Sequence, residues 1–361
     1  MTEENVTLKQ IAELAGVSIT TVHRVLNGKG GYSQPIKEKI LHIAKEQGYT
    51  VNYAASSIRK HTLHIALIFP ANGWGYAWYL QSMLDGYLEF RRQISKFNIV
   101  FQEYYSQSEE DVGKILHDIC QERPVAYDGV VIYDIDPSAK TAAKINYLLG
   151  KRIPVVMLEK DSVAIEGACC VCPDQEMAGQ IAGNMMEKML RGAGKVTVLA
   201  QNLQEADQNA QAFVKRLEAS RPDLTVEQIF LRVDMPKLDD QVLKSLENAD
   251  GVYMTSARNS VIYLKALERL QSRPTAAIGS ELFDESRAAL NREMLDAVID
   301  KRPFCIGYHA LEKMFACLVK NEPLPRQWDI VPRIILQANC DAYAHSQRKE
   351  EGLWGQTQTF R

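Results

Sequence analysis

The segment AGVSITTVHRVLNG (residues 15–28) places hydrogen-bonding side chains on a helical pattern that is otherwise apolar. Thr20 and Thr21 offer hydroxyl and methyl groups, and His23 and Arg24 follow within one helical turn. A threonine methyl can contact the methyl of thymine, and an arginine can bond guanine O6 and N7 together. If these side chains lie on one exposed helix face, their chemistry suits the reading of DNA; an ordinary solvated face is the alternative.

Two short helices joined by a tight turn are expected to position this face. Thr7 caps the first helix and Gly16 ends it, and Ser18 caps the second, residues 19–26, which Asn27-Gly28 closes. Braced by a third helix, the pair forms a helix-turn-helix. In that arrangement the second helix lies in the major groove with its N-terminal residues at base edges.

The third helix is expected to begin at a Ser33 cap, with Pro35 in its first turn, and to end at Gly48. The spacing of apolar residues predicts a small core formed by Leu8, Ile11, Ala12, Ala15, Val17, Val22, Val25, Leu26, Ile36, Ile40, Leu41 and Ala44. The polar face of the second helix, together with Ile19, is then left pointing outward.

The bulk composition is that of an ordinary globular protein of two or three domains. The 361 residues are 46% hydrophobic and 24% charged, and no apolar run approaches membrane-spanning length. The polar N terminus is unlike a signal peptide, so we expect a cytoplasmic protein that does not contact a membrane. Residues 1–60 carry eight Lys/Arg against five Asp/Glu, within a chain of net charge −3, which weakly indicates a polyanion partner for this part alone.

Seven cysteines in a chain of this length indicate a reducing compartment rather than a disulfide framework. The segment ACCVCPD, with Cys169, Cys170 and Cys172, has no neighbouring histidine and no second cysteine pair at zinc-site spacing. We therefore expect a structural strand there, and neither a metal nor a cofactor.

From Leu63 onward the pattern alternates between strands and helices. Short Val/Ile-rich runs predict strands at 64–70, 97–105, 127–136, 152–160, 194–201, 250–256 and 275–281. Helices are expected between them, among others at 79–93, 109–121 and 261–271. This alternation predicts an α/β fold of two lobes, with parallel sheets, helices on both faces and ligands at the carboxyl ends of the strands.

The residues also resemble a known family. TLKQIAELAGVSITTVHRVLNG, followed by KEKILHIAKEQGY and NYAASSIRK, is similar to the DNA-binding headpiece of the lactose-repressor (LacI/GalR) family of bacterial transcription regulators. The similarity extends to about residue 340 and includes a periplasmic-binding-protein-like effector domain, closest to a branch whose headpieces read TVDRVLNG. The resemblance implies a repressor that binds a palindromic DNA operator as a homodimer, under allosteric control by a small molecule.

The resemblance assigns DNA contacts by position. Ile19 and Thr20 match the main base-reading positions, and His23 replaces the usual Ser or Asp. Ile58 matches a residue that wedges into the minor groove, and the basic Arg59 follows it in a hinge helix; a plain linker is the alternative reading of this segment. Phosphate or base contacts are assigned to Thr7, Ser18, Thr21, Arg24 and Asn27.

The resemblance places the effector between the two lobes. The matching positions are Phe69, Tyr133, Glu159, Asn209, Ser256, Glu281 and Asp300. Trp74 and Trp78 are candidate stacking platforms for a sugar ring, unless they belong to the core or to an interface. Glu159 or Asp300 could instead cap a helix.

Asn209 stands where the family has a sugar-binding arginine, and Arg258 is the one cation that the pattern identifies beside Glu159, Glu281 and Asp300. A carboxylate-lined cleft with one cation favours a neutral sugar or sugar alcohol over an acidic ligand.

These observations predict four segments: a headpiece at 1–50, a hinge at 51–62, an effector domain at 63–340 and a polar tail at 341–361. The first lobe is expected at about 63–165 and 300–327, and the second at about 166–299 and 328–340. A solute-binding protein and a glycosidase-like enzyme remain the alternatives. The sequence has no nucleophile elbow, Walker loop or H-E-x-x-H motif, so we expect no enzyme.

Overall fold

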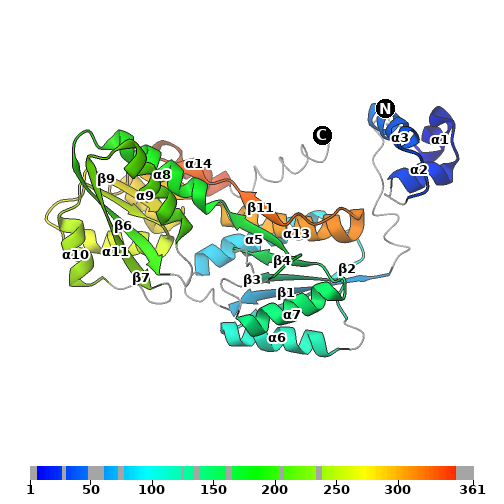
Figure 1. The fold of residues 1–361 in the computed structure, drawn as a ribbon, viewed down its shortest axis with the longest axis horizontal. Helices are drawn as coiled ribbons and strands as arrows, with labels where there is room; N and C mark the ends of the chain where they lie inside the picture. Colours follow the sequence, from blue (N-terminus) through cyan, green and yellow to red (C-terminus); the bar gives the residue numbers. More distant parts are fainter. Residues whose placement is uncertain are drawn as a thin grey trace.

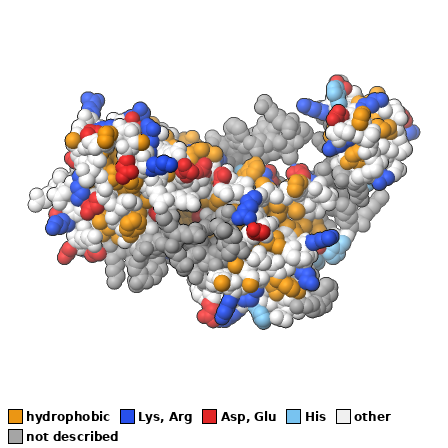
Figure 2. Space-filling model, in the orientation of Figure 1, with side chains coloured by type: hydrophobic (Ala, Val, Ile, Leu, Met, Phe, Trp, Pro, Cys, Tyr) orange, Lys and Arg blue, Asp and Glu red, His pale blue; other side chains and the backbone are white. Residues whose placement is uncertain are grey.

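The computed structural model describes residues 6–26, 30–47, 61–71, 77–122, 126–133, 138–159, 165–202, 207–232 and 238–346. They form a small helical unit and two α/β lobes, each built on a six-stranded sheet (Figure 1). On the visible surface of the lobes, basic and acidic side chains are interspersed (Figure 2). No helix in these ranges is long and apolar enough to cross a bilayer.

The helical unit contains α1 (Leu8–Ala15), α2 (Ile19–Leu26) and α3 (Gln34–Glu46), as the sequence predicted. Thr7 and Gln10 form a reciprocal cap at the start of α1: the Thr7 N–H donates to Gln10 Oε1 at 2.7 Å, and Thr7 Oγ1 accepts from the Gln10 N–H at 3.4 Å. Gly16 ends the helix in the left-handed conformation, at φ 69°. These local interactions explain why the boundaries of α1 were predictable.

Two details of the predicted headpiece are wrong. Ser33 stands at the start of α3, but its side chain makes no capping hydrogen bond. Leu41, expected in the core, is 44% exposed, because the buried side of α3 runs through Ile40 and Ala44 instead. The expected stops at Asn27-Gly28 and Gly48 lie outside the described residues.

The first lobe has the strand order β11-β5-β4-β3-β1-β2, with all neighbours parallel. Its strands are β1 (Leu63–Pro70), β2 (Ile99–Ser106), β3 (Gly129–Tyr133), β4 (Val155–Leu158), β5 (Cys169–Pro173) and β11 (Gln327–Ile330). Helices α5 (Ala77–Gln93) and α13 (Pro303–Lys320) pack on one face of the sheet, and α6 (Glu109–Gln121) and α7 (Ala139–Gly150) on the other. Neighbouring strand residues face opposite layers: Leu67 packs with α5 and α13, and Ile68 with α6 and α7.

The second lobe has the order β12-β10-β9-β8-β6-β7. Its strands are β6 (Gly194–Asn202), β7 (Leu224–Arg232), β8 (Gly251–Met254), β9 (Ala276–Ser280), β10 (Ala297–Asp300) and β12 (Arg333–Ile335). Strand β12 runs antiparallel to β10, and the other pairs are parallel. The helices are α8 (Gln175–Met189), α9 (Gln208–Ser220), α10 (Asp240–Glu247), α11 (Ala257–Leu267), α12 (Asp284–Asn291) and α14 (Gln337–Ser346).

The lobe boundaries differ from the predicted ones, because strands β5 and β11 both pair in the sheet of the first lobe. Strand β5 pairs with β4 and β11, so it belongs to the first lobe rather than to a second lobe that begins near residue 166. Strand β11 keeps the chain in the first lobe to Ile330, and helix α14 extends to Ser346, into the segment predicted as tail. In the described residues the chain therefore passes between the lobes after β5, after β10 and after β11.

The predicted strands are all found, including the cysteine-rich β5, whose cysteines are buried. Helix α11 begins four residues before the predicted 261, because Ser256 caps it and sets its start. Strands β7, β10, β11 and β12 were not predicted.

Candidate functional site

The outward face of α2 is built by a cap and by two buried valines. The Thr21 N–H donates to Ser18 Oγ at 3.1 Å, and the two hydroxyl oxygens lie 2.9 Å apart. Val22 and Val25 are buried against α1 and α3. Since residues three apart share a helix face, their burial fixes which side of α2 turns outward.

The side chains predicted to read DNA lie on this outward face. Ile19 is 48% exposed; Thr20, His23 and Arg24 are exposed, and Thr21 is half-buried. Their exposure is confirmed, whereas their contact with DNA stays a prediction. Thr7 is exposed as well, but its hydroxyl is engaged in the α1 cap, and Asn27, Ile58 and Arg59 lie outside the described residues.

A second group of polar side chains gathers where strands of both lobes end. Glu159 follows β4 in the first lobe, and Tyr79 lies in the first turn of α5. Glu281 follows β9 in the second lobe, and Lys301 follows β10. We call these four residues the cleft cluster.

In the first lobe, the Tyr79 hydroxyl donates to Glu159 Oε1 at 2.5 Å. Burial raises the pKa of Glu159, while the Tyr79 hydrogen bond and the charge of Lys301 act to lower it. The pKa of Tyr79 is raised well above its usual value, mainly by burial and to a smaller extent by the nearby carboxylates of Glu159 and Glu281. Since Lys301 and Glu281 follow strands of the second lobe, these two pKa values are influenced by groups of the other lobe.

In the second lobe, Glu281 and Lys301 form a buried ion pair. Lys301 Nζ lies 3.1 Å from Glu281 Oε1 and donates to the Thr255 carbonyl at 3.0 Å. The Lys301 backbone N–H donates to Glu281 Oε2 at 3.1 Å. Burial raises the pKa of Glu281 to about 7, although Lys301 opposes this; Asp300 adds to the rise.

Beside this pair, Asp300 is fully buried and accepts a hydrogen bond from Arg333 Nε at 2.8 Å. The sequence-based expectation of one cation at the cleft is therefore wrong, because Lys301 and Arg333 both pair with its carboxylates. Lys301 directly follows Asp300 in sequence and was overlooked. Arg333 reaches Asp300 through the antiparallel pairing of β10 and β12, which no local pattern reveals.

Two predicted effector residues stabilise the second lobe through their side chains. Asn209 accepts from the Tyr253 hydroxyl at 2.6 Å and donates to the Thr255 carbonyl at 3.4 Å. Ser256 Oγ accepts from the Asn259 N–H and so caps α11. Both side chains are buried, which makes them supports of the strand ends that carry the cluster.

The predicted aromatic residues differ in their surroundings. Phe69 and Tyr133 are buried in the core of the first lobe, and Phe69 packs on Tyr87. Trp78 stacks on Phe283 with ring centroids 5.0 Å apart and an interplanar angle of 22°. Since Trp78 belongs to α5 and Phe283 follows β9, this stack joins the two lobes.

Two further residues were predicted at the effector site, Arg258 and Trp74. Arg258 is partly buried in the first turn of α11. Trp74 lies outside the described residues. Tyr79, Phe283, Lys301 and Arg333 are the site residues that the sequence did not identify.

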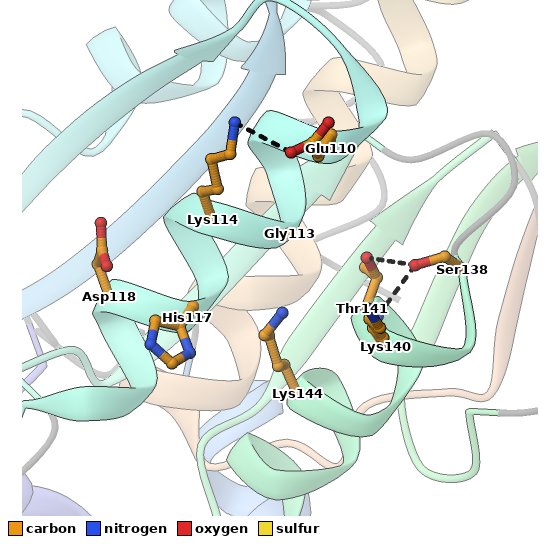
Figure 3. Close-up of a pocket in the computed structure, with 9 residues that line it drawn as sticks. All are labelled: Glu110, Gly113, Lys114, His117, Asp118, Ser138, Lys140, Thr141 and Lys144. Carbon is orange, nitrogen blue, oxygen red and sulfur yellow. Dashed lines mark hydrogen bonds and ion pairs between the residues drawn. The ribbon is translucent and has the colours of Figure 1, made fainter.

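A separate groove of about 300 Å³ lies between α6 and α7 on the first lobe (Figure 3). Lys114 in its wall is paired with Glu110 at 3.2 Å and with Asp111 at 3.4 Å. The groove carries both signs of charge and contains none of the predicted site residues. No group of His, Cys, Asp and Glu within the described ranges could hold a metal ion.

Comparison with known proteins agrees with this two-part arrangement. Residues 65–322 match the family model described as periplasmic binding protein domain, and residues 7–52 match that of bacterial regulatory proteins, lacI family. The Probable HTH-type transcriptional repressor ExuR of Bacillus subtilis (strain 168) is 30% identical over 162 residues, which cover 43% of this chain and 44% of that protein. The Sucrose operon repressor of Klebsiella pneumoniae is 43% identical over 82 residues, 21% of this chain and 25% of the relative. The chain thus matches less than half the length of these relatives.

Solved structures share the fold at low identity. The myo-inositol binding protein of Caulobacter, bound to myo-inositol, superposes with a TM-score of 0.63 at 14% identity, covering 79% of this chain and 96% of that one. The transcriptional regulator CelR in complex with cellobiose has a TM-score of 0.58 at 17% identity, covering 92% of this chain and 99% of that one. At these identities the likeness concerns the fold alone.

Proposed function

Because residues 65–322 belong to the periplasmic binding protein domain family and residues 7–52 match the lacI family of bacterial regulatory proteins, we propose that the chain is a repressor controlled by a small effector. The observation that carries this proposal is the exposed polar face of α2, held outward by Val22 and Val25. Ile19 and Thr20 at the start of α2 would read base edges, and Arg24 would contact guanine or phosphate. The proposed repressor has a DNA-binding headpiece at residues 1–50 and a hinge at residues 51–62.

The proposed repressor acts as a homodimer, because a palindromic operator presents two half-sites. Support comes from the outer strands of the two sheets, β2 and β7, which occupy equivalent positions in the strand orders. Val100 and Tyr105 on β2 are 46% and 50% exposed, and Phe230 on β7 is 56% exposed. Large apolar side chains exposed on both edges fit a surface that a second copy covers.

The proposed effector is a neutral sugar or sugar alcohol that binds at the cleft cluster. Glu159 and Glu281 can accept hydrogen bonds from hydroxyls, and Lys301 can donate to a hydroxyl oxygen. Lys301 Nζ lies 3.1 Å from Glu281 Oε1, so an acidic ligand at this ammonium would also meet a carboxyl group. A Ribitol operon repressor of Klebsiella aerogenes, 41% identical over 71 residues, is among the relatives whose names mention a polyol or a sugar.

The DNA-binding half is tested by selecting a duplex from a random library with the wild-type protein and measuring the affinity of variants for it. Thr20→Ala should lose about 1–3 kcal/mol of binding free energy and relax the preference at the base that it contacts. His42→Ala, on an exposed position of α3, serves as the matched control and should bind as the wild type does. Equal binding by Thr20→Ala would contradict the proposal, and sedimentation of a complex with one chain per duplex would contradict the dimer.

The effector half is tested by thermal unfolding in the presence of neutral sugars, sugar alcohols and sugar acids. A ligand at about 100 times its Kd adds roughly 2.7 kcal/mol to the free energy of unfolding. Stabilisation by a neutral compound, lost in Glu159→Gln, is the expected result. A response to sugar acids alone would overturn the neutral assignment.

A further inference from the structure

The turn between α2 and α3 contains two adjacent glycines with different surroundings. A Cβ built on Gly31 would lie 2.5 Å from Arg24 Nη2, 2.8 Å from Arg24 Cζ and 3.1 Å from Arg24 Nη1. A Cβ built on Gly30 would meet nothing within 4 Å. The Arg24 guanidinium therefore occupies the space that a side chain at residue 31 would fill.

The guanidinium lies against Gly31 by packing, a contact that uses none of its N–H donors. Among the described residues, Arg24 makes no hydrogen bond or ion pair, and its side chain is exposed on the outward face of α2. A guanidinium has five N–H donors in a rigid fork, and no residue that the structure describes takes one from Arg24. Ordering a long side chain before binding reduces the entropy lost when the complex forms.

We propose that Gly31 is a positioning residue for Arg24: the missing side chain at residue 31 lets the guanidinium pack against the turn, which aims it at DNA before the complex forms. The inference rests on the proposed DNA-binding function. A single added methyl group at residue 31 displaces the guanidinium, because the far end of a flexible side chain yields more easily than the backbone.

Binding to the duplex selected by the wild type separates this role from a general effect on the fold. Gly31→Ala should weaken binding about tenfold, within the range expected for a contact to a base. Gly30→Ala, the matched neighbour, should stay within about twofold of the wild type. In an Arg24→Ala background, Gly31→Ala should cause no further loss, because the group it acts through is gone.

Gly31 has φ 96°, a backbone conformation that alanine adopts only with strain, so the double variant is the decisive comparison. If Gly31→Ala weakens binding equally with and without Arg24, the loss comes from the turn itself, and the positioning role is overturned. Tighter binding by Gly31→Ala would also overturn it, since the wild-type packing would then hold Arg24 away from DNA.

A second readout does not depend on DNA. In ¹⁵N relaxation measurements on the free full-length protein, the Arg24 Nε–Hε group should be ordered in the wild type and in Gly30→Ala, and mobile in Gly31→Ala. Arg24→Ala identifies the signal by removing it. A mobile wild-type signal would overturn the positioning role even if DNA binding is intact; an ordered signal in a protein that selects no duplex would support the positioning and contradict only the proposed function.

Discussion

Glu281 follows β9 in the left-handed conformation, at φ 66°, and its carboxylate accepts from the Lys301 N–H while its second oxygen lies against Lys301 Nζ. Removing two charges from water is costly, and close pairing offsets the cost only when hydrogen bonds satisfy the remaining atoms. Here the Thr255 carbonyl accepts a hydrogen bond from the Lys301 ammonium, and burial still raises the pKa of Glu281 to about 7. The proton on Glu281 therefore becomes part of the folding equilibrium.

Glu281→Gln should flatten the pH dependence of stability. In the unfolded chain a glutamate loses its proton near pH 4.3, whereas folded Glu281 keeps it up to about pH 7. Between these values the folded state binds more protons, so the free energy of unfolding contributed by this group falls as the pH rises through the window. Urea unfolding at several pH values from 4.5 to 8 measures the slope, with the exposed Glu285→Gln as control. An unchanged slope in Glu281→Gln would show that the raised pKa is not a property of this group.

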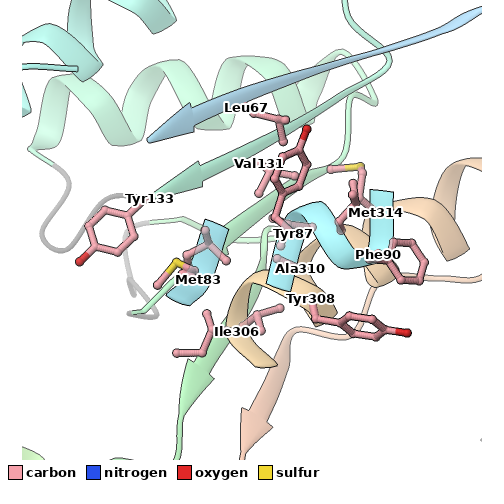
Figure 4. Packing of buried hydrophobic residues seen from close by; sticks show 14 of the residues in the cluster. Leu67, Met83, Tyr87, Phe90, Val131, Tyr133, Ile306, Tyr308, Ala310 and Met314 are labelled. Atoms are coloured by element: carbon pink, nitrogen blue, oxygen red, sulfur yellow. The ribbon is translucent and has the colours of Figure 1, made fainter. Parts of the chain in front are cut away.

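At the scale of elements, α5 and α13 cross with their backbones in contact. A Cβ on Gly86 of α5 would lie 1.9 Å from the Phe304 carbonyl oxygen, and a Cβ on Gly307 of α13 would lie 1.9 Å from that of Met83. Around this crossing, buried side chains from both helices fill the layer against the sheet (Figure 4). Because α5 begins beside Tyr79 and α13 begins just after Lys301, the crossing sets the spacing of the cleft cluster.

Gly86→Ala should therefore destabilise the protein, since backbone atoms cannot yield as side chains do. Overpacking of this kind costs about 1–3 kcal/mol or more. Gly113→Ala on α6 is the matched control: its Cβ would meet Thr141 Oγ1 at an ordinary 3.6 Å, and the better helix propensity should leave stability unchanged or raise it by up to about 1 kcal/mol. Urea unfolding of both variants checks the difference. Equal midpoints would indicate that the two helices can move apart freely.

At the scale of the whole molecule, the two lobes, which three chain crossings join within the described ranges, also touch through side chains. Trp78 of the first lobe and Phe283 of the second are stacked. Aromatic pairs contribute about 0.5–1.5 kcal/mol beyond their buried area. The stack therefore favours the arrangement in which the lobes are in contact.

Phe283→Ala should shift the molecule toward separated lobes. Loss of about 1 kcal/mol changes the ratio of two conformations about fivefold. Small-angle scattering of the ligand-free protein should give a larger radius of gyration for Phe283→Ala, and Phe283→Tyr, which keeps the ring, should match the wild type. The same radius in all three proteins would show that the stack does not hold the lobes together.

The sequence by itself determined the elements whose causes are local. Thr7 and Gly16 delimit α1, Ser18 starts α2, and the spacing of Val22 and Val25 turns Thr20 and Arg24 outward. The alternation of strand and helix patterns predicted the parallel two-lobed fold for the same reason. Each strand and each amphipathic helix is recognised from a window of about ten neighbouring residues. The family resemblance added the position of Glu159 and Glu281 at strand ends.

Only the tertiary structure decided which of these residues meet. Arg333 reaches Asp300 through strand pairing, Lys301 turns its ammonium onto Glu281, and Phe283 covers Trp78 from the opposite lobe. These contacts join residues far apart in sequence or depend on how the chain leaves a strand, and a local pattern carries no information about such distances. The predicted excess of carboxylates at the effector site was wrong for this reason. The balance of charge there depends on Lys301 and Arg333, which the fold places beside Glu281 and Asp300.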